Sequence, residues 1–232
     1  TTEQAEELLE IIKAELEVNE RLREDFPEAC GEGRKWKIGH IITANGVKMR
    51  GMGAGKKLRG MRYGSRRPDL VLGDDLENDE AVDSPEQRKK FENWFFKALM
   101  KIGAKYTVYF IVGTILHYDS LLFNLLKRPG WRGKKFKAVI RWSDSPLWER
   151  WEQIFSNPIN DNGAAEAGAD RFFVDNAAAM LADTEVLWPE TEYYYYLMKM
   201  RVSDGPAAFD SEKQNEPVDP EDCLFQEEWF RY

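Results

Sequence analysis

The sequence predicts an α/β fold with a largely parallel sheet, followed by a C-terminal helical subdomain. Two observations support this. In residues 1–145, short apolar runs typical of strands, such as residues 70–73 and 107–112, alternate with stretches of helical periodicity. Such alternation favours parallel strands connected by helices. From Trp148 onward the pattern becomes helical and irregular. We therefore expect a core domain over residues 1–145 and a helical lid or linker region over residues 146–232.

Composition limits the class of protein. The 232 residues are 43% hydrophobic and 13% aromatic, enough for a sizeable core. A net charge of −8 argues against a protein that coats nucleic acid with its whole surface, but it allows a local basic patch. The two cysteines, Cys30 and Cys223, lie far apart without a CxxC partner, which argues against a disulfide framework or a zinc site and favours a reducing cytoplasm. The apolar runs are much shorter than the ~20 residues of a membrane helix, and no signal peptide is visible.

The first elements follow from local signals. Thr1 and Gln4 form a capping-box pattern before apolar residues at helical spacing, so a helix is expected at once. Such an abrupt start suggests that preceding structure has been removed. Residues 38–43 and 47–49, joined at Asn45-Gly46, predict a β-hairpin, because Asn-Gly supplies the positive φ of a tight turn. A segment rich in glycine and arginine follows at residues 50–67.

The middle of the chain continues the alternation. Ser84-Pro85 predicts a helix start with an N-cap and proline at the first position. Residues 107–112 form an apolar, β-branched run typical of a strand covered on both faces. The remaining expectations are one buried helix face, a further strand, four helices and a linker, as follows: Phe91, Trp94, Phe95, Ala98, Leu99 and Ile102 on the face; the strand at 136–140; helices at 120–127, 148–155, 167–181 and 190–200; and the linker at 163–169.

The most informative stretch is the strand at residues 70–73, which leads directly into Asp74 and Asp75. In P-loop motors, a strand that ends in adjacent acids holds Mg²⁺ with the first acid and orients the attacking water with the second. Two other interpretations stay open. The acids can form a solvated turn, or Asp74, Asp75 and Glu77 can belong to a two-metal nuclease. Nucleases usually collect such acids from separate strands, which counts mildly against the second alternative.

A matching phosphate loop, GxxxxGK(S/T), is absent from the chain. Residues 51–57 come nearest, but Arg50 occupies the first glycine position and Lys57 replaces the Ser or Thr that would bind Mg²⁺. We predict a flexible basic loop here, with Lys56 and Lys57 as possible DNA contacts.

Two further features suit phosphate chemistry. Arg59, Arg62, Arg66 and Arg67 precede the acidic strand, and an arginine that reaches a neighbouring subunit's γ-phosphate would stabilise the transition state. The alternative is a solvated, arginine-rich loop. Gly113-Thr114 ends the next strand, where a small hydroxyl side chain could sense the γ-phosphate.

In their order along the chain, these residues resemble the large subunit of tailed-phage and prophage terminases, the ATPase that pumps DNA into a capsid. Short segments carry the resemblance: ELEVN at 15–19, DFP at 25–27, the Asn45-Gly46 hairpin, LRG at 58–60, RPDLVLGDDLE at 67–77, VGT at 112–114, LWPE at 187–190, and Phe209 with EKQNEP at 212–217. Together they are spread over most of the chain, from residue 15 to residue 217.

The resemblance implies a P-loop (ASCE) NTPase core that uses ATP and Mg²⁺. Asp74 matches the Walker B magnesium acid, and Asp75 matches the catalytic carboxylate. Gly113-Thr114 matches the coupling motif, with Thr114 sensing the phosphate, and Arg59 matches an arginine that acts in trans on the adjacent subunit. The helical stretch after Trp148 would be the lid.

The resemblance also implies partners: double-stranded DNA, a small DNA-recognition subunit, the capsid portal and a ring of identical subunits, in the bacterial host cytoplasm. The family's Walker A segment would precede Thr1, and its nuclease domain would follow Tyr232. We therefore expect the chain alone to turn over ATP poorly or not at all. A non-catalytic assembly or DNA-contacting module and a metal-dependent nuclease remain the alternatives.

Overall fold

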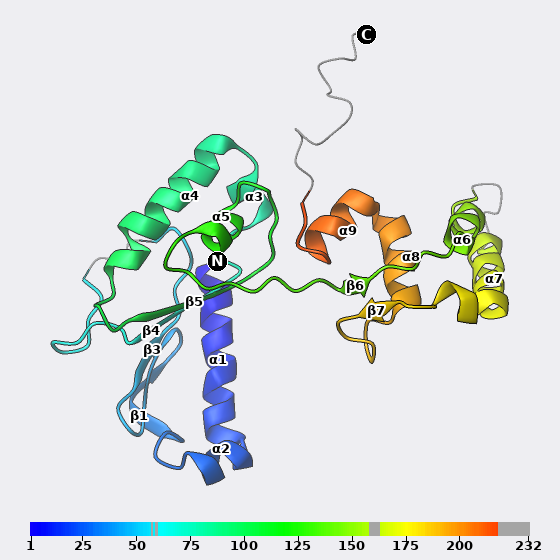
Figure 1. The fold of residues 1–232 in the computed structure, drawn as a ribbon. Coiled ribbons are helices and arrows are strands. Elements are labelled where there is room, and N and C mark those ends of the chain that lie inside the picture. Colours follow the sequence, from blue (N-terminus) through cyan, green and yellow to red (C-terminus); the bar gives the residue numbers. More distant parts are fainter. Residues whose placement is uncertain (57, 59, 158–162, 218–232) are drawn as a thin grey trace. The chain divides into compact units, whose positions relative to one another are not determined.

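The computed structural model describes residues 1–56, 58, 60–157 and 163–217. The chain divides into two compact units, Thr1–Val112 and Gly113–Tyr232, which are described separately below (Figure 1). The division predicted at residue 145 separates an ATPase core from a lid, and it stays a prediction.

The first unit opens as its capping signals predict. Helix α1 (Thr2–Val18) begins at a complete capping box between Thr1 and Gln4, and α2 (Glu20–Asp25) follows with Asn19 as its N-cap. The Asn45-Gly46 turn is confirmed: it joins β2 (His40–Thr43) to β3 (Lys48–Arg50) as an antiparallel hairpin. Strand β1 (Glu32–Lys37) adds to β2 and was not predicted, because its sequence EGRKWK has one apolar residue.

A helical crossover connects two parallel strands in the same unit. Strand β4 (Leu70–Asp74) pairs in parallel with β5 (Val108–Val112), in a register that runs from Leu70↔Val108 to Asp74↔Val112. The chain between them forms α3 (Asp79–Val82), α4 (Pro85–Lys97) and the 3₁₀ turn η1 (Leu99–Lys101). The predicted α4 start is confirmed, since the Ser84 hydroxyl accepts a hydrogen bond from the Gln87 N–H at 3.3 Å.

The two faces of the β4–β5 pair differ sharply. On one face, the Tyr109 hydroxyl donates to the Met100 carbonyl at 3.0 Å, so this face packs on the crossover. On the other, five apolar side chains are 47–61% exposed: Leu70, Leu72, Val108, Phe110 and Val112. The expectation that residues 107–112 are covered on both faces is therefore wrong for this unit.

The second unit is mainly helical. Its elements are α5 (Leu121–Lys127), β6 (Val139–Arg141), α6 (Leu147–Phe155), α7 (Ala164–Met180), β7 (Glu185–Val186), α8 (Tyr194–Asp204) and α9 (Pro206–Glu212). Helices α6 and α7 lie side by side, and β6 pairs with β7 in antiparallel orientation (Figure 1). The linker predicted at residues 163–169 is wrong, because α7 begins at Ala164. Helix α9 was not predicted.

One aromatic core holds this unit together. Trp151, Met180, Leu197 and Phe209 are essentially fully buried in it. The Phe173 and Tyr195 rings stack with their centroids 3.8 Å apart, and the Trp148 ring meets Trp151 edge to face at 5.3 Å. The helical unit therefore has a dense core of its own.

Among the described strands, β4 and β5 form the one parallel pair, and the other two sheets are antiparallel. The structure is thus a mixture of helices and small sheets. The largely parallel sheet of P-loop (ASCE) type stays a prediction. Within the described ranges, no helix is long and apolar enough to cross a bilayer.

Candidate functional site

The carboxyl end of β4 presents the two predicted acids. Asp74 is the last residue of the strand and pairs with Val112, the last residue of β5. The Asp75 backbone N–H donates to the Val112 carbonyl at 3.1 Å, which extends the pairing by one residue. The side chains of both aspartates are exposed. Two adjacent carboxylates therefore stand open to solvent at one edge of the parallel pair.

A sharp turn at Asp75 ends the strand. Its φ of 38° lies in the left-handed region, where few residues other than glycine are found and where Asp and Asn are tolerated best. Just before it, a Cβ added to Gly73 would lie 2.8 Å from side-chain atoms of Ile111 and Leu76. Glycine at position 73 thus lets Leu76 fold back against the strand once the chain has turned.

The donor chemistry of this edge suits Mg²⁺ held together with a nucleotide. Mg²⁺ usually keeps several waters and binds through one or two carboxylates plus substrate phosphates. Asp74 and Asp75 supply such carboxylates. Across the ranges that the structure describes, no group of three or more acidic, histidine or cysteine side chains is placed to hold a metal ion.

The predicted coupling residues follow β5 directly along the chain. Gly113 and Thr114 come immediately after Val112, and the backbone of the next residue is held firmly. The Ile115 N–H donates to the Asn215 side-chain oxygen at 2.9 Å, and the Asn215 amide nitrogen donates to the Phe136 carbonyl at 3.0 Å. Asn215 therefore fixes the segment that starts with Thr114, a role that sequence reasoning did not assign.

The neighbours of Asn215 join the same region. Gln214 is buried, and its side-chain oxygen accepts the Val139 N–H at 3.3 Å. Ion pairs with Lys135 and Lys137, at 2.8 and 2.6 Å, lower the pKa of Glu216. Residues 214–216 therefore connect the end of α9 to β6 and to the segment after Thr114.

Of the two possible DNA-contacting lysines, Lys57 lies outside the described residues, as does Arg59. Lys56 is exposed, and its carbonyl accepts a hydrogen bond from the Trp94 indole at 3.0 Å, which ties the loop to α4. Lys56 and Arg50 line a cavity of about 560 Å³ together with His40. Burial, followed by the charges of Lys35, Lys48 and Arg50, lowers the pKa of His40.

The glycines of this loop have a packing role. A Cβ on Gly51 would lie 2.3 Å from the Ala5 carbonyl oxygen, and one on Gly53 would lie 2.6 Å from the Thr2 nitrogen. They let the loop lie against the first turns of α1. Among the described residues, α3 is the next helix along the chain, so the strand–loop–helix arrangement of a phosphate loop is not formed here.

The described arginines differ in their surroundings. Arg67 donates to the Lys101 and Ile102 carbonyls, both at 3.0 Å, and so secures the end of the crossover. Arg62 and Arg66 are exposed. The role of Arg59 in trans stays a prediction.

Comparisons of the chain with models of protein families, with curated proteins and with solved structures found no match.

Proposed function

We propose that this chain is part of the ATP-hydrolysing motor of a DNA-packaging terminase large subunit. One observation carries the proposal. The parallel pairing of β4 and β5 across a helical crossover places Asp74, Asp75 and the residue before Gly113-Thr114 at one sheet edge. In open α/β sheets, ligands bind at the carboxyl ends of the strands.

The roles are those that the resemblance to terminase large subunits implies for the matching positions of this chain. Asp74 would hold Mg²⁺, which supplies charge neutralisation for the phosphates. Asp75 would orient the attacking water, and Thr114 would sense the γ-phosphate. Arg59 would complete the site of a neighbouring subunit.

The exposed face of β4 and β5 supports an incomplete catalytic core. Parallel sheets are normally covered on both faces, and a contiguous apolar patch marks a surface that another element contacts. A segment that carries the phosphate loop would both cover this face and cradle the triphosphate. Without it, the chain alone would hydrolyse little ATP.

The proposed partners are double-stranded DNA, a small DNA-recognition subunit, the capsid portal and further copies of the chain in a ring. Lys56 and Arg50, which line the same cavity, are the described candidates for DNA phosphate contacts. The proposed setting is the bacterial host cytoplasm, with transient attachment to the portal.

The test is MgATP hydrolysis by the 232 residues, measured alone and joined to a segment that supplies a phosphate loop. We expect no turnover by the 232 residues and DNA-stimulated turnover by the longer protein. Efficient turnover by the 232 residues would contradict the half-site proposal. Plasmid nicking with Mn²⁺ that disappears in Asp74→Ala, without ATP hydrolysis, would replace it with a nuclease.

A further inference from the structure

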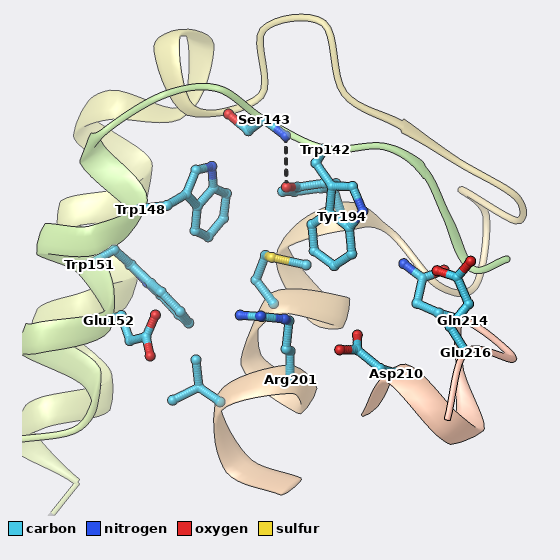
Figure 2. Close-up of a pocket in the computed structure, with 12 residues that line it drawn as sticks. Trp142, Ser143, Trp148, Trp151, Glu152, Tyr194, Arg201, Asp210, Gln214 and Glu216 are labelled. Carbon is cyan, nitrogen blue, oxygen red and sulfur yellow. Dashed lines mark hydrogen bonds between the residues drawn. The ribbon is translucent and has the colours of Figure 1, made fainter. Parts of the chain in front are cut away.

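The helical unit contains a cavity that the proposed function does not use. It has a volume of about 400 Å³, and all of its lining residues belong to the second unit. Figure 2 shows aromatic rings around it, with Arg201 and Asp210 projecting from α8 and α9. Flat apolar walls with a few converging polar groups are typical of small-ligand sites.

The indoles from α6 contribute mainly apolar surface. The Trp148 indole N–H donates to the Met180 carbonyl at 2.8 Å, and that of Trp151 donates to the Tyr195 hydroxyl at 3.2 Å. The Tyr194 hydroxyl accepts the Ser143 N–H at 3.0 Å, the bond drawn in Figure 2. With these polar groups already bonded, recognition of a ligand's polar atoms falls to the charged side chains.

Arg201 and Asp210 have opposite charges but form no ion pair with each other. The Arg201 guanidinium lies over the Trp142 ring, 5.5 Å from its centroid, and forms no hydrogen bond with any described residue. Its Nε is buried without a partner in the described part of the chain. Burial raises the pKa of Asp210, which the charge of Arg201 partly offsets. Within the described residues, the terminal guanidinium nitrogens of Arg201 and the carboxylate of Asp210 thus form no hydrogen bond and are available to a ligand in the cavity.

The electrostatics favour a neutral ligand. Arg201 supplies one positive charge, whereas Asp210 and Glu152 line the same cavity with carboxylates. Glu216, which also lines it, is already paired with Lys135 and Lys137. A phosphate would be repelled by Asp210 and Glu152. A flat ring with acceptors on one edge and donors on another would satisfy both Arg201 and Asp210 and pack against the indoles.

We propose that this cavity binds a guanine base. Guanine presents O6 and N7 as a paired acceptor for an arginine fork, and N1–H and N2–H as donors for a carboxylate. Proteins read extruded bases with such polar contacts while aromatic side chains pack on the ring. The base can come from a free nucleotide or from an unpaired nucleotide in a DNA strand, with the phosphate kept outside the cavity.

The experiment is a tryptophan-fluorescence titration of the chain with guanosine and adenosine monophosphates, and with oligothymidine strands that do or do not contain one guanine. Saturable quenching that is about tenfold tighter for guanine than for adenine is expected, from the size of a bidentate base contact. Binding by the monophosphate alone assigns a free nucleotide, and tighter binding by the guanine-containing strand assigns DNA; both support the proposal.

Variants locate the site. Arg201→Gln and Asp210→Asn are each expected to weaken guanine binding about tenfold or more. Arg201→Lys keeps the charge but loses the fork, so the preference for guanine over adenine should shrink to the part that Asp210 contributes. Arg171→Gln, at an exposed position of α7, is the matched control and should bind like the unaltered chain. Circular dichroism confirms folding. Equal affinities for guanine and adenine, no saturable quenching, or full binding by folded Arg201→Gln would overturn the proposal.

Discussion

The two units differ in how completely they bury their apolar side chains. In the helical unit, Trp151 and Phe209 are 1% exposed in a continuous aromatic core. In the first unit, the strands that lead to Asp74 and Gly113 leave Phe110 57% exposed and its apolar neighbours similarly open. One unit is closed around its core, whereas the other presents candidate catalytic acids on a sheet that is half covered.

This difference indicates where the chain depends on other elements. An isolated pair of strands is marginally stable in water, so the β4–β5 edge relies on its crossover and on whatever covers the open face. The helical unit has no such requirement. Geometry at the acids should therefore respond to added segments, while the helical unit should behave alike with or without them.

The largest expected effect is on the free energy of unfolding, and it comes from making the same substitution, Phe to Ala, once in each unit. Phe209→Ala should lower the free energy of unfolding by about 3–5 kcal/mol, because it leaves a cavity in the core of the helical unit. Phe110→Ala, on the open face of β5, should change it by less than about 0.5 kcal/mol. Urea denaturation followed by circular dichroism measures both. Equal losses would show that the face of β5 is covered in solution.

An intermediate effect is expected at Asn215. Asn215→Ala removes two hydrogen bonds that hold Ile115 and Phe136, and it places alanine at a φ of 53°. A loss of about 2 kcal/mol should result. Asn215→Gly tolerates the positive φ, so it should recover only the part of this stability loss that comes from backbone strain in the alanine variant. Full recovery in the glycine variant would mean that the amide contacts contribute nothing; thermal unfolding distinguishes these cases.

The smallest effect depends on pH. Asp170 bonds Lys199 at 2.7 Å and the Tyr195 hydroxyl at 2.6 Å, and these two contacts lower its pKa. Because the folded pKa is lowered, the contribution of Asp170 is present above its ordinary pKa and is lost as the pH falls through the lowered value. Asp170→Asn should cost about 1 kcal/mol at pH 7, since the group is partly exposed.

The pH dependence of the stability loss provides the control for Asp170→Asn. The stability difference between Asp170→Asn and the unaltered chain should shrink as the pH is lowered below the ordinary pKa of about 3.8. A difference that stays constant into strong acid would show that the carboxylate charge has no part in it.

Local signals predicted many of the elements. The capping box at Thr1, the N-cap at Ser84, the Asn45-Gly46 turn and the strand before Asp74 all depend on residues within a few positions of one another. Backbone conformation at such positions is set largely by short-range hydrogen bonds, so the sequence reveals it.

What could not be predicted has two causes: a weak local signal and distant contacts. Strand β1 pairs with β2 across the short turn at Ile38-Gly39, but its own residues carry little apolar signal. The Asn215 bond to Ile115 spans 100 residues, and no periodicity marks it. The coverage of β5 was misjudged because an apolar run is the same whether one face or both are buried.

The most direct test of the central claim compares the two ends of strand β4. Asp75 follows its carboxyl end, and Asp69 precedes its amino end as an exposed acid. In the chain joined to a segment that supplies a phosphate loop, Asp75→Asn should keep the backbone turn but reduce DNA-stimulated MgATP turnover by about 10²-fold or more, with KM little changed. Asp69→Asn should leave turnover unchanged. Full turnover in Asp75→Asn, or equal losses in both variants, would contradict the assignment of this edge as the hydrolytic site.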